Sequence, residues 1–277
     1  MSKDNLQKIQ QRNLVTIIMS KLIISLLLAV SISFFVSCSE HTLAESENKQ
    51  KDAVPVAELV RESDTLFSQR TDISKLKSAV QTLARARNAD QRDFEVEWRF
   101  AKFNYFLGKQ ITDEKEADKV LKDGYTAGLI ASRIEPNKPE GYFWAGANLG
   151  EQAKRSPVTV GLKSKDEIRQ LMNKVIEIQP NYQGASAFDA LAQLELATSL
   201  FGGKAEKAVE YLEKALQYEK ENSYIRLHLA EAYLAVQKKS EAKRELEFIL
   251  KMKPNPEYQV EYQEVLEKAK KMLDTKF

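Results

Sequence analysis

The chain has 277 residues, a formal net charge of +2 and 30% charged residues of both signs. Residues 1–37 carry four basic and one acidic side chain, so residues 38–277 have a formal charge of −1. A nucleic-acid-binding protein would concentrate basic residues on one face, and no nucleic-acid partner is expected. With only ten glycines and seven prolines, the chain is poor in turn signals and is predicted to form long helices.

Residues 1–37 combine basic residues with a long apolar run. The run from Leu22 to Val36 has fifteen residues without a charge and directly follows Lys21. A basic segment, an apolar segment of this length and a small residue before a cleavage point are typical of a secretory signal peptide. A membrane-spanning helix needs about 20 apolar residues, and a run extended to that length would contain Lys21. A cleaved signal is therefore predicted in preference to a membrane span.

Cys38 is the only cysteine, and it follows this apolar run in the sequence FVSC. That sequence resembles a bacterial lipobox, whose cysteine is lipidated and becomes the mature N-terminus. The alternative, a buried structural cysteine, is disfavoured because Cys38 lies outside any segment that could fold. Two or more acyl chains anchor a protein stably, so Cys38 is predicted to attach the protein to a membrane rather than to act as a catalytic thiol.

Two further expectations concern this end of the chain. The sequence from Met19 to Cys38 would be a complete lipoprotein signal by itself, and we hypothesise that Met19 is the true start. Ser39 offers no acidic signal for retention at the inner membrane. In a host with two membranes, the predicted location is therefore the periplasmic face of the outer membrane rather than the inner membrane.

Residues 38–55 are predicted to be the lipidated cysteine and a flexible tether, because they are polar and lack periodicity. Residues 56–277 are predicted to form the folded domain. The first helix is expected near Val56, and small and apolar residues then recur at helical spacing in segments 78–90, 97–108, 124–137, 141–154, 168–182, 185–201, 207–222, 223–254 and 256–277. A ten-residue excess, RSPVTVGLKS, separates the helices on either side of it, and LFGGKAE is predicted to be a widened turn.

The last third of the chain contains an internal repeat. Three positions recur at a displacement of 34 residues, as Ala208, Leu212 and Ala215 and then as Ala242, Leu246 and Ile249. This is the period of the tetratricopeptide repeat (TPR), a pair of antiparallel helices. The sequence thus predicts an all-α fold, an α-solenoid of about five degenerate TPR-like helix pairs with a C-terminal capping helix over 256–277. An unrelated helical bundle is the alternative.

Residues 141–196, together with the following FGGKAEKAVEYLEKAL, resemble one family of repeat proteins. It is the T component of TRAP-transporter-associated proteins (TatT), which are periplasmic lipoproteins with several cryptic TPR units. The resemblance extends over roughly residues 56–255. It implies a periplasmic solute-binding protein as partner and a homotrimer that encloses a pore. It implies no set of catalytic residues.

The sequence offers no constellation for catalysis. Its two histidines, His41 and His228, are far apart, and neither lies in a cluster with metal-ligand spacing. FGGKAE lacks the spacing of a phosphate-binding loop, and the carboxylates alternate with lysines as on solvated helix faces. We therefore expect no enzyme, no catalytic residue, no metal and no cofactor.

The segment GYFWAGANLGE is the candidate binding surface. Tyr142 is predicted to occupy the packing position between helices, while Trp144, Asn148 and Glu151 are spaced i, i+4 and i+7 and share another face. An aromatic ring beside an amide and a carboxylate could recognise a peptide or a polar ligand. The alternative is that Trp144 packs beneath the inserted SPVTVGL.

Arg155 and Lys163 flank the insertion and are weaker candidates for the same binding role. The predicted function is a lipid-anchored scaffold associated with a TRAP transporter. A scaffold for outer-membrane or envelope assembly is one alternative, and a carrier of a small hydrophobic ligand in the solenoid is another.

Overall fold

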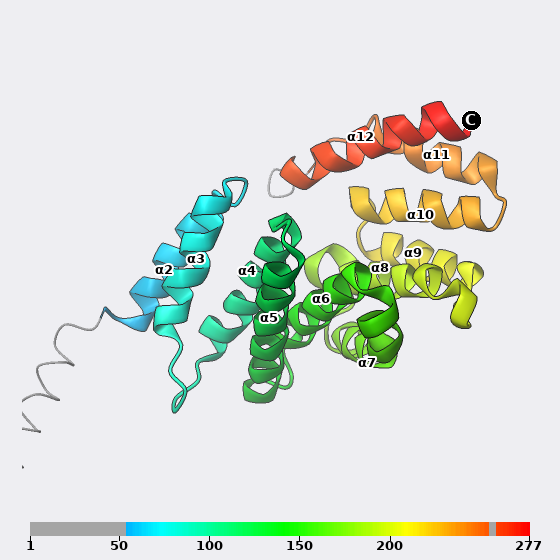
Figure 1. The fold of residues 1–277 in the computed structure, drawn as a ribbon. Helices are drawn as coiled ribbons and strands as arrows, with labels where there is room; N and C mark the ends of the chain where they lie inside the picture. The colour runs from blue at the N-terminus through cyan, green and yellow to red at the C-terminus, as the bar shows by residue number, and fades with distance from the viewer. Residues whose placement is uncertain (1–53, 255–258) are drawn as a thin grey trace, which may run out of the picture. The chain divides into compact units, whose positions relative to one another are not determined.

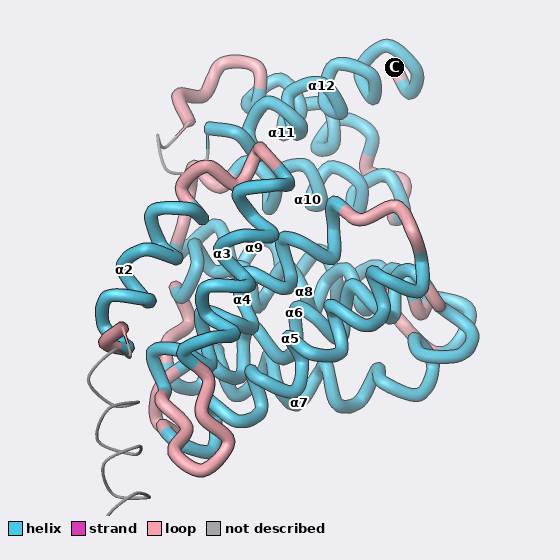
Figure 2. The backbone as a smooth tube through the Cα atoms, turned by 60° about the vertical axis from the view of Figure 1, so that its left-hand side comes forward, coloured by secondary structure: helices cyan, strands magenta, loops and turns pink. Residues whose placement is uncertain are grey.

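The computed structural model describes residues 54–254 and 259–277. The predicted signal peptide, Cys38 and all but the last two residues of the predicted tether lie outside these ranges. Within them, the chain consists of helices and connecting turns without a strand (Figure 2). Residues 56–277 form one compact unit.

Five helix pairs and a final helix follow one another along the unit (Figure 1). The pairs are α2 (Val56–Phe67) with α3 (Ile73–Ala86), α4 (Phe94–Gln110) with α5 (Glu114–Ile134), α6 (Pro139–Arg155) with α7 (Leu162–Ile178), α8 (Tyr182–Ala197) with α9 (Ala205–Tyr218), and α10 (Ser223–Ala235) with α11 (Lys239–Ile249); α12 (Gln259–Lys276) follows them. The predicted α-solenoid of five pairs with a C-terminal helix is confirmed.

Short polar side chains set several helix starts. The carboxylates of Asp72, Asp93 and Asp113 accept hydrogen bonds from the backbone N–H groups of Ser74, Val96 and Glu116, at 2.8, 3.1 and 2.8 Å. The Asn222 side chain caps α10 in the same way. Such caps satisfy N–H groups that have no partner within the helix, and each contributes about 1 kcal/mol. The sequence thus marks where individual helices begin, independently of how the pairs pack.

Helices α5 and α6 approach each other closely because small residues lie at their contact. A Cβ atom added to Gly128 would lie 2.6 Å from the backbone nitrogen of Ala145, and one added to Gly124 would collide with the Asn148 side chain. Ala131 and Ala145 are fully buried at the same contact. The small residues predicted to pack in these segments do so, and their size sets the distance between the two helices.

Helix α8 packs on both sides. Its residues Ala187, Leu191 and Leu194 belong to the apolar core shared with α2–α7, whereas Phe188 and Ala192 belong to the core shared with α9–α12. A helix that is apolar on two faces is buried between neighbours. Each pair of the stack therefore depends on the next one for burial, as expected of a repeat fold.

The first helix of each pair contacts the first helix of the following pair, so α2, α4, α6, α8, α10 and α12 form one layer. We call these six helices the inner layer. The layer curves back on itself, because the guanidinium of Arg70, just after α2, lies 2.9 Å from a carboxylate oxygen of Glu261 on α12. The amide of Gln110, at the end of α4, donates to the carbonyl of Arg70 at 3.0 Å.

The structure corrects the prediction for the insertion between α6 and α7. RSPVTVGLKS was expected to separate the two helices, but Pro157–Gly161 forms a turn of π-helix and α7 begins directly at Leu162. Backbone N–H groups of Val160 and Gly161 both donate to the carbonyl of Ser156. The extra residues are thus absorbed mainly by helix, because a widened helical turn satisfies its own backbone hydrogen bonds.

The close contact between α5 and α6 yields a stability prediction. Gly128→Ala should lower the free energy of unfolding by up to about 2 kcal/mol, because an overpacking cost of about 1–3 kcal/mol exceeds the gain of about 1 kcal/mol in helix propensity. Gly150→Ala, on α6 but with nothing within 4 Å of an added Cβ, is the matched control and should stabilise. Urea unfolding measures both. Equal effects of the two substitutions would contradict the packing argument.

Candidate functional site

Trp144 faces the preceding helix pair. Its side chain is 3% exposed, and its ring centroid lies 5.7 Å from that of Tyr105 and 6.0 Å from that of Phe106, both on α4. Phe143 packs edge-on against it at 4.9 Å. Apart from Phe143 on its own helix, the aromatic neighbours of Trp144 therefore lie on α4. Its indole Nε1 is buried and has no hydrogen-bond partner within the described part of the chain.

Asn148 and Arg155 hold the second and third pairs together. The Asn148 amide is fully buried and donates to the carbonyls of Ala101 and Trp144, at 2.9 and 2.7 Å. Arg155 donates to the carbonyl of Gly108 at 2.9 Å and reaches Glu114 and Ile111 at 3.1 Å. The prediction that Asn148 lies on an accessible binding face is wrong, because its side chain is fully buried and its amide nitrogen donates to two backbone carbonyls.

The other three predicted residues lie apart from one another. Glu151 is largely buried and lies 3.4 Å from the Arg155 guanidinium. Tyr142 is half-buried, and its hydroxyl donates to the carbonyl of Pro136 at 3.3 Å. Lys163 is exposed at the start of α7. Tyr142 packs against the N-terminal apolar core, as predicted, but the adjacent Phe143 is buried more deeply, at 7% exposed.

A second group of side chains meets on the inner layer, and we call it the inner cluster: Tyr105 and Lys109 on α4, Asp189 on α8, Tyr224 and His228 on α10, and Glu264 on α12. The imidazole Nδ1 of His228 lies 2.6 Å from the Asp189 carboxylate, and the Tyr224 hydroxyl donates to Glu264 at 2.7 Å. The Lys109 ammonium lies 6.0 Å from the centroid of the Tyr224 ring. Four different inner helices therefore contribute to one polar and aromatic group.

Electrostatics indicate that these side chains share one environment. Burial raises the pKa of the Tyr105 phenol, and the carboxylates of Glu151, Asp189 and Glu264 raise it further. Those three carboxylates come from α6, α8 and α12, so charges on three other inner helices affect the ionisation of the phenol on α4. Titratable groups with perturbed pKa values are enriched at functional sites, which makes the inner cluster the candidate site.

The His228–Asp189 pair has a defined charge preference. Burial opposes protonation of His228, but the Asp189 carboxylate outweighs burial and raises the pKa of the imidazole. Glu231 on α10 acts in the same direction, whereas Lys268 on α12 opposes it. On α12, burial opposes ionisation of Glu264, but hydrogen bonds from Lys268 and Tyr224 lower its pKa. The cluster thus holds charges of both signs in close contact.

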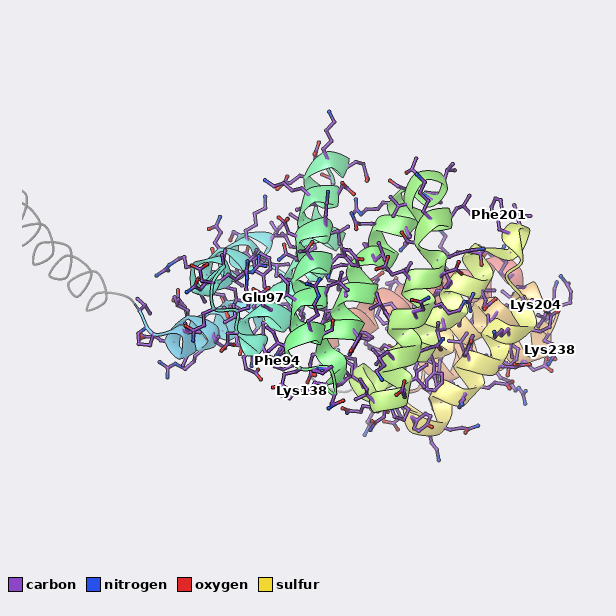
Figure 3. The ribbon with its side chains drawn as sticks, turned by 90° about the horizontal axis from the view of Figure 1, so that it is seen from below. Phe94, Glu97, Lys138, Phe201, Lys204 and Lys238 are labelled. Carbon is purple, nitrogen blue, oxygen red and sulfur yellow. The ribbon has the colours of Figure 1, made fainter. Side chains whose placement is uncertain are left out.

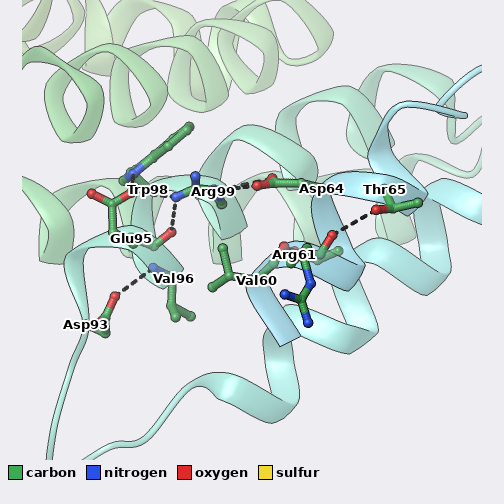
Figure 4. A network of polar contacts seen from close by, with 10 residues as sticks. Val60, Arg61, Asp64, Thr65, Asp93, Glu95, Val96, Trp98 and Arg99 are labelled. Atoms are coloured by element: carbon green, nitrogen blue, oxygen red, sulfur yellow. Dashed lines mark hydrogen bonds and ion pairs between the residues drawn. The ribbon is translucent and has the colours of Figure 1, made fainter. Parts of the chain in front are cut away.

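The N-terminal pairs carry ion networks that are structural. Arg99 on α4 reaches Asp64 on α2 at 3.0 Å and Glu95 at 2.5 Å, and the Trp98 indole donates to the same Glu95 (Figure 4). Glu97 is fully buried between two guanidinium groups, Arg87 at 2.9 Å and Arg92 at 2.8 Å. Figure 3 places Glu97 near Phe94, whose ring lies beneath the Lys138 ammonium. These contacts join neighbouring helices and leave their carboxylates paired.

Two other classes of site are not found in the described part of the chain. No group of three or more histidine, cysteine, aspartate or glutamate side chains there could hold a metal ion. No described helix combines the length and the apolar character needed to cross a membrane. The inner cluster therefore stays the candidate site.

Comparisons with known proteins assign the fold. The sequence profile of the family described as "Regulator of microtubule dynamics protein 1-3" matches residues 59–187, and that of the tetratricopeptide repeat matches residues 202–260. A comparison with curated proteins gives no match. The two profile matches divide the stack near α8–α9, where its two apolar cores also meet.

A solved structure agrees with the repeat assignment. The crystal structure of TTC0263, a thermophilic TPR protein in Thermus thermophilus, aligns with a TM-score of 0.53 at 20% identity and covers 76% of this chain and 99% of that chain. MamA residues 41-end from Desulfovibrio magneticus RS-1 align with a TM-score of 0.46 at 18% identity, covering 72% and 95%. This protein is an α-solenoid of TPR type.

Sequence reasoning missed most of the inner cluster. Tyr105 lies in segment 97–108, which was predicted only as a helix with apolar packing residues, and His228 was considered only as a metal ligand and excluded. Asp189, Lys109 and Glu264 gave no signal, because isolated charged residues on helices resemble any solvated face. The available signal was weak: these residues fall on first helices of successive repeats, and such helices form one layer.

The role of Arg155 can be tested by stability. Arg155→Met should lower the free energy of unfolding by about 1–3 kcal/mol, because it leaves buried carbonyls without a donor. Lys163 is also one of the predicted binding residues but is exposed, so Lys163→Met should change the free energy of unfolding by less than about 0.5 kcal/mol. Chemical denaturation of both variants provides the measurement. If the Arg155→Met protein were as stable as the parent, the structural role of Arg155 would be contradicted and Arg155 would again be a candidate binding residue.

The His228–Asp189 pair predicts a pH-dependent stability. Because folding raises the pKa of His228, the pair stabilises fully below the unfolded value of about 6.5, and this contribution is lost as pH rises through the folded pKa. The stability difference between the parent and His228→Gln should therefore be larger at pH 6 than at pH 9. Asp189→Asn should abolish the same dependence. A difference that stays constant or grows with pH would refute the assignment.

Proposed function

We propose that this protein is a lipid-anchored periplasmic scaffold, the T component associated with a TRAP transporter, whose inner layer binds a periplasmic solute-binding protein. The observation that carries the scaffold role is the inner cluster, in which α4, α8, α10 and α12 present charged and aromatic side chains together. The finer assignment is supported by the lipobox-like FVSC at Cys38 and by the resemblance of residues 141–196 to the TatT family.

The inner cluster suits a partner surface for a physical reason. Tyrosine and histidine offer a rigid apolar body with a polar end, and tyrosine in particular is enriched in protein interfaces. Lys109 and Glu264 are exposed, so charges of both signs are available to orient a partner. Complementary charges raise the association rate and exclude wrong partners more than they add affinity. A scaffold that must release its partner benefits from fast and selective association at moderate affinity.

A second candidate function is a carrier of a small hydrophobic ligand. The specific observation in its favour is the aromatic group of Tyr105, Phe106 and Trp144, which shares Tyr105 with the inner cluster. Tyr105 and Phe106 are only half-buried, so their rings are accessible to a ligand. Native mass spectrometry of the purified protein distinguishes this function, because a carrier should retain a lipid-like molecule that a Trp144→Ala variant loses.

The scaffold proposal predicts position-specific crosslinking. A photo-reactive amino acid at position 109, in the inner cluster, should crosslink a periplasmic solute-binding protein in intact cells. The same amino acid at position 119, exposed on the second helix α5, should not. Lys109→Glu should reduce co-purification of the partner by roughly tenfold, as expected for reversal of one close charge contact.

Other outcomes reassign the function without affecting the fold. Recovery of outer-membrane assembly proteins from position 109, without a solute-binding protein, would replace the transporter role with envelope assembly. Equal crosslinking from positions 109 and 119 would show that the partner does not bind specifically to the inner layer. In both cases, a Lys109→Glu protein with unchanged thermal unfolding serves as the control for folding.

A further inference from the structure

The turn between α8 and α9 presents two large apolar side chains to solvent. Leu200 is 90% exposed and Phe201 is 58% exposed, although they are adjacent in a chain whose other apolar residues mostly pack into cores. Isolated exposed apolar residues are ordinary on protein surfaces. Two consecutive ones at the tip of a turn, each able to pack elsewhere, need a specific reason.

The turn is held in this form by its own hydrogen bonds. Ser199–Phe201 forms one turn of 3-10 helix (η2), and the N–H groups of Phe201 and Gly203 both donate to the carbonyl of Thr198, at 2.7 and 2.9 Å. Gly202 has a φ of 95°, which only glycine adopts without strain. The backbone N–H of Lys204 donates to the buried carboxylate of Glu195 at 3.1 Å. The tip is therefore anchored at both ends, and the two side chains project outward.

Lysines surround this tip. Figure 3 shows Phe201, Lys204 and Lys238 at the same end of the molecule, where α10 packs against α8 and α9. Lys207 and Lys239 stand within the first turn of α9 and of α11. The acidic residues in these first turns are Glu206, which is exposed, and Glu241, which is half-buried. Glu195 is 4% exposed and paired with Arg169 at 2.6 Å and with Lys207 at 3.8 Å. The exposed Lys204, Lys238 and Lys239 outnumber Glu206 and Glu241, so the surface keeps an excess of positive charge.

We infer that this surface, formed by Leu200, Phe201, Lys204 and Lys238 and here called the turn edge, contacts an anionic lipid bilayer. Apolar side chains that enter the boundary between headgroups and acyl chains, flanked by lysines that reach phosphates, are the ordinary means by which a folded protein rests on a membrane. Each lysine near an anionic surface adds to binding, and the attraction weakens within a Debye length. The turn edge has both components within two neighbouring turns.

A lipid surface fits the turn edge better than a protein partner does. A stable protein interface buries about 1,600 Å² in total and needs a shaped surface of about 20–30 residues on each side. The turn edge offers two projecting side chains and long, flexible lysines, which match a fluid layer of phosphates rather than a fixed set of partners. The inference rests on this turn and does not require the inner layer to bind any protein.

A local fluorescent label tests the inference on the full chain. An environment-sensitive fluorophore is attached at Phe201→Cys in a chain that also carries Cys38→Ser, and vesicles of phosphatidylcholine with about one third phosphatidylglycerol are added. The emission should shift to the blue, and a quencher placed in the acyl chains should reduce it. Leu250→Cys is the matched control: Leu250 is also a partly exposed apolar residue, at the far end of α11 from Lys239, and its label should stay in water.

A charge variant separates the lipid contact from other sources of binding. Lys204→Gln combined with Lys238→Gln should weaken the response at position 201 roughly ten- to thirtyfold on anionic vesicles, at about a fivefold loss per lysine. On vesicles of phosphatidylcholine alone, parent and variant should respond equally weakly.

The inference fails if the label at position 201 stays in water while the protein floats with anionic vesicles. It also fails if labels at 201 and 250 respond alike, which would indicate unfolding on the surface. A blue shift at position 201 that needs raised protein concentration and no vesicles would assign the turn edge to self-association instead. Binding by the residues before Val56 produces none of the expected differences, because every readout is local to the turn.

Discussion

Each helix pair of this protein can bury its apolar face only against the next pair, and this constraint governs the rest of the structure. Helix α8 shows it directly, since Leu191 packs toward the N-terminal core and Phe188 toward the C-terminal core. The pairs must therefore lie close, and closeness requires small residues such as Gly128 at the crossing of α5 and α6. The backbone distance between neighbours then fixes which polar groups can reach across.

The polar side chains divide into two sets according to that geometry. Asn148, Arg155 and Glu97 are buried or nearly so and are engaged by neighbouring helices. They hold adjacent pairs in register and have little capacity left for a partner. The inner cluster differs, because Tyr224 pairs with Glu264 and His228 with Asp189, while Lys109 and Glu264 are exposed. Polar side chains that could contact a partner are therefore found on the inner layer, whereas those between the pairs are already engaged.

The curvature of the stack adds a link between its ends. The ion pair of Arg70 with Glu261 joins residues 191 positions apart, and Lys109 on α4 lies over the ring of Tyr224 on α10. Such contacts can exist only when the stack completes enough of a turn to bring its ends together. A partner held by the inner cluster would touch α4 in the second pair and α10 in the last pair at once, so binding and the curvature of the solenoid are coupled.

The sequence by itself determined the repeat, the helix pairs and the capping helix. The displacement of 34 residues, the capping aspartates and the small residues at helical spacing are local signals, and local signals survive without knowledge of the fold. The predictions for Cys38 and the segment before Val56 rest on the same kind of signal. Only the tertiary structure decided which face of each helix is open. It buried Trp144 and Asn148, which were predicted to form a binding face, against α4. It also brought Tyr105, Asp189, His228 and Glu264 together. Their meeting depends on small rotations between successive pairs that accumulate along the stack, and no single segment of the sequence encodes the total rotation.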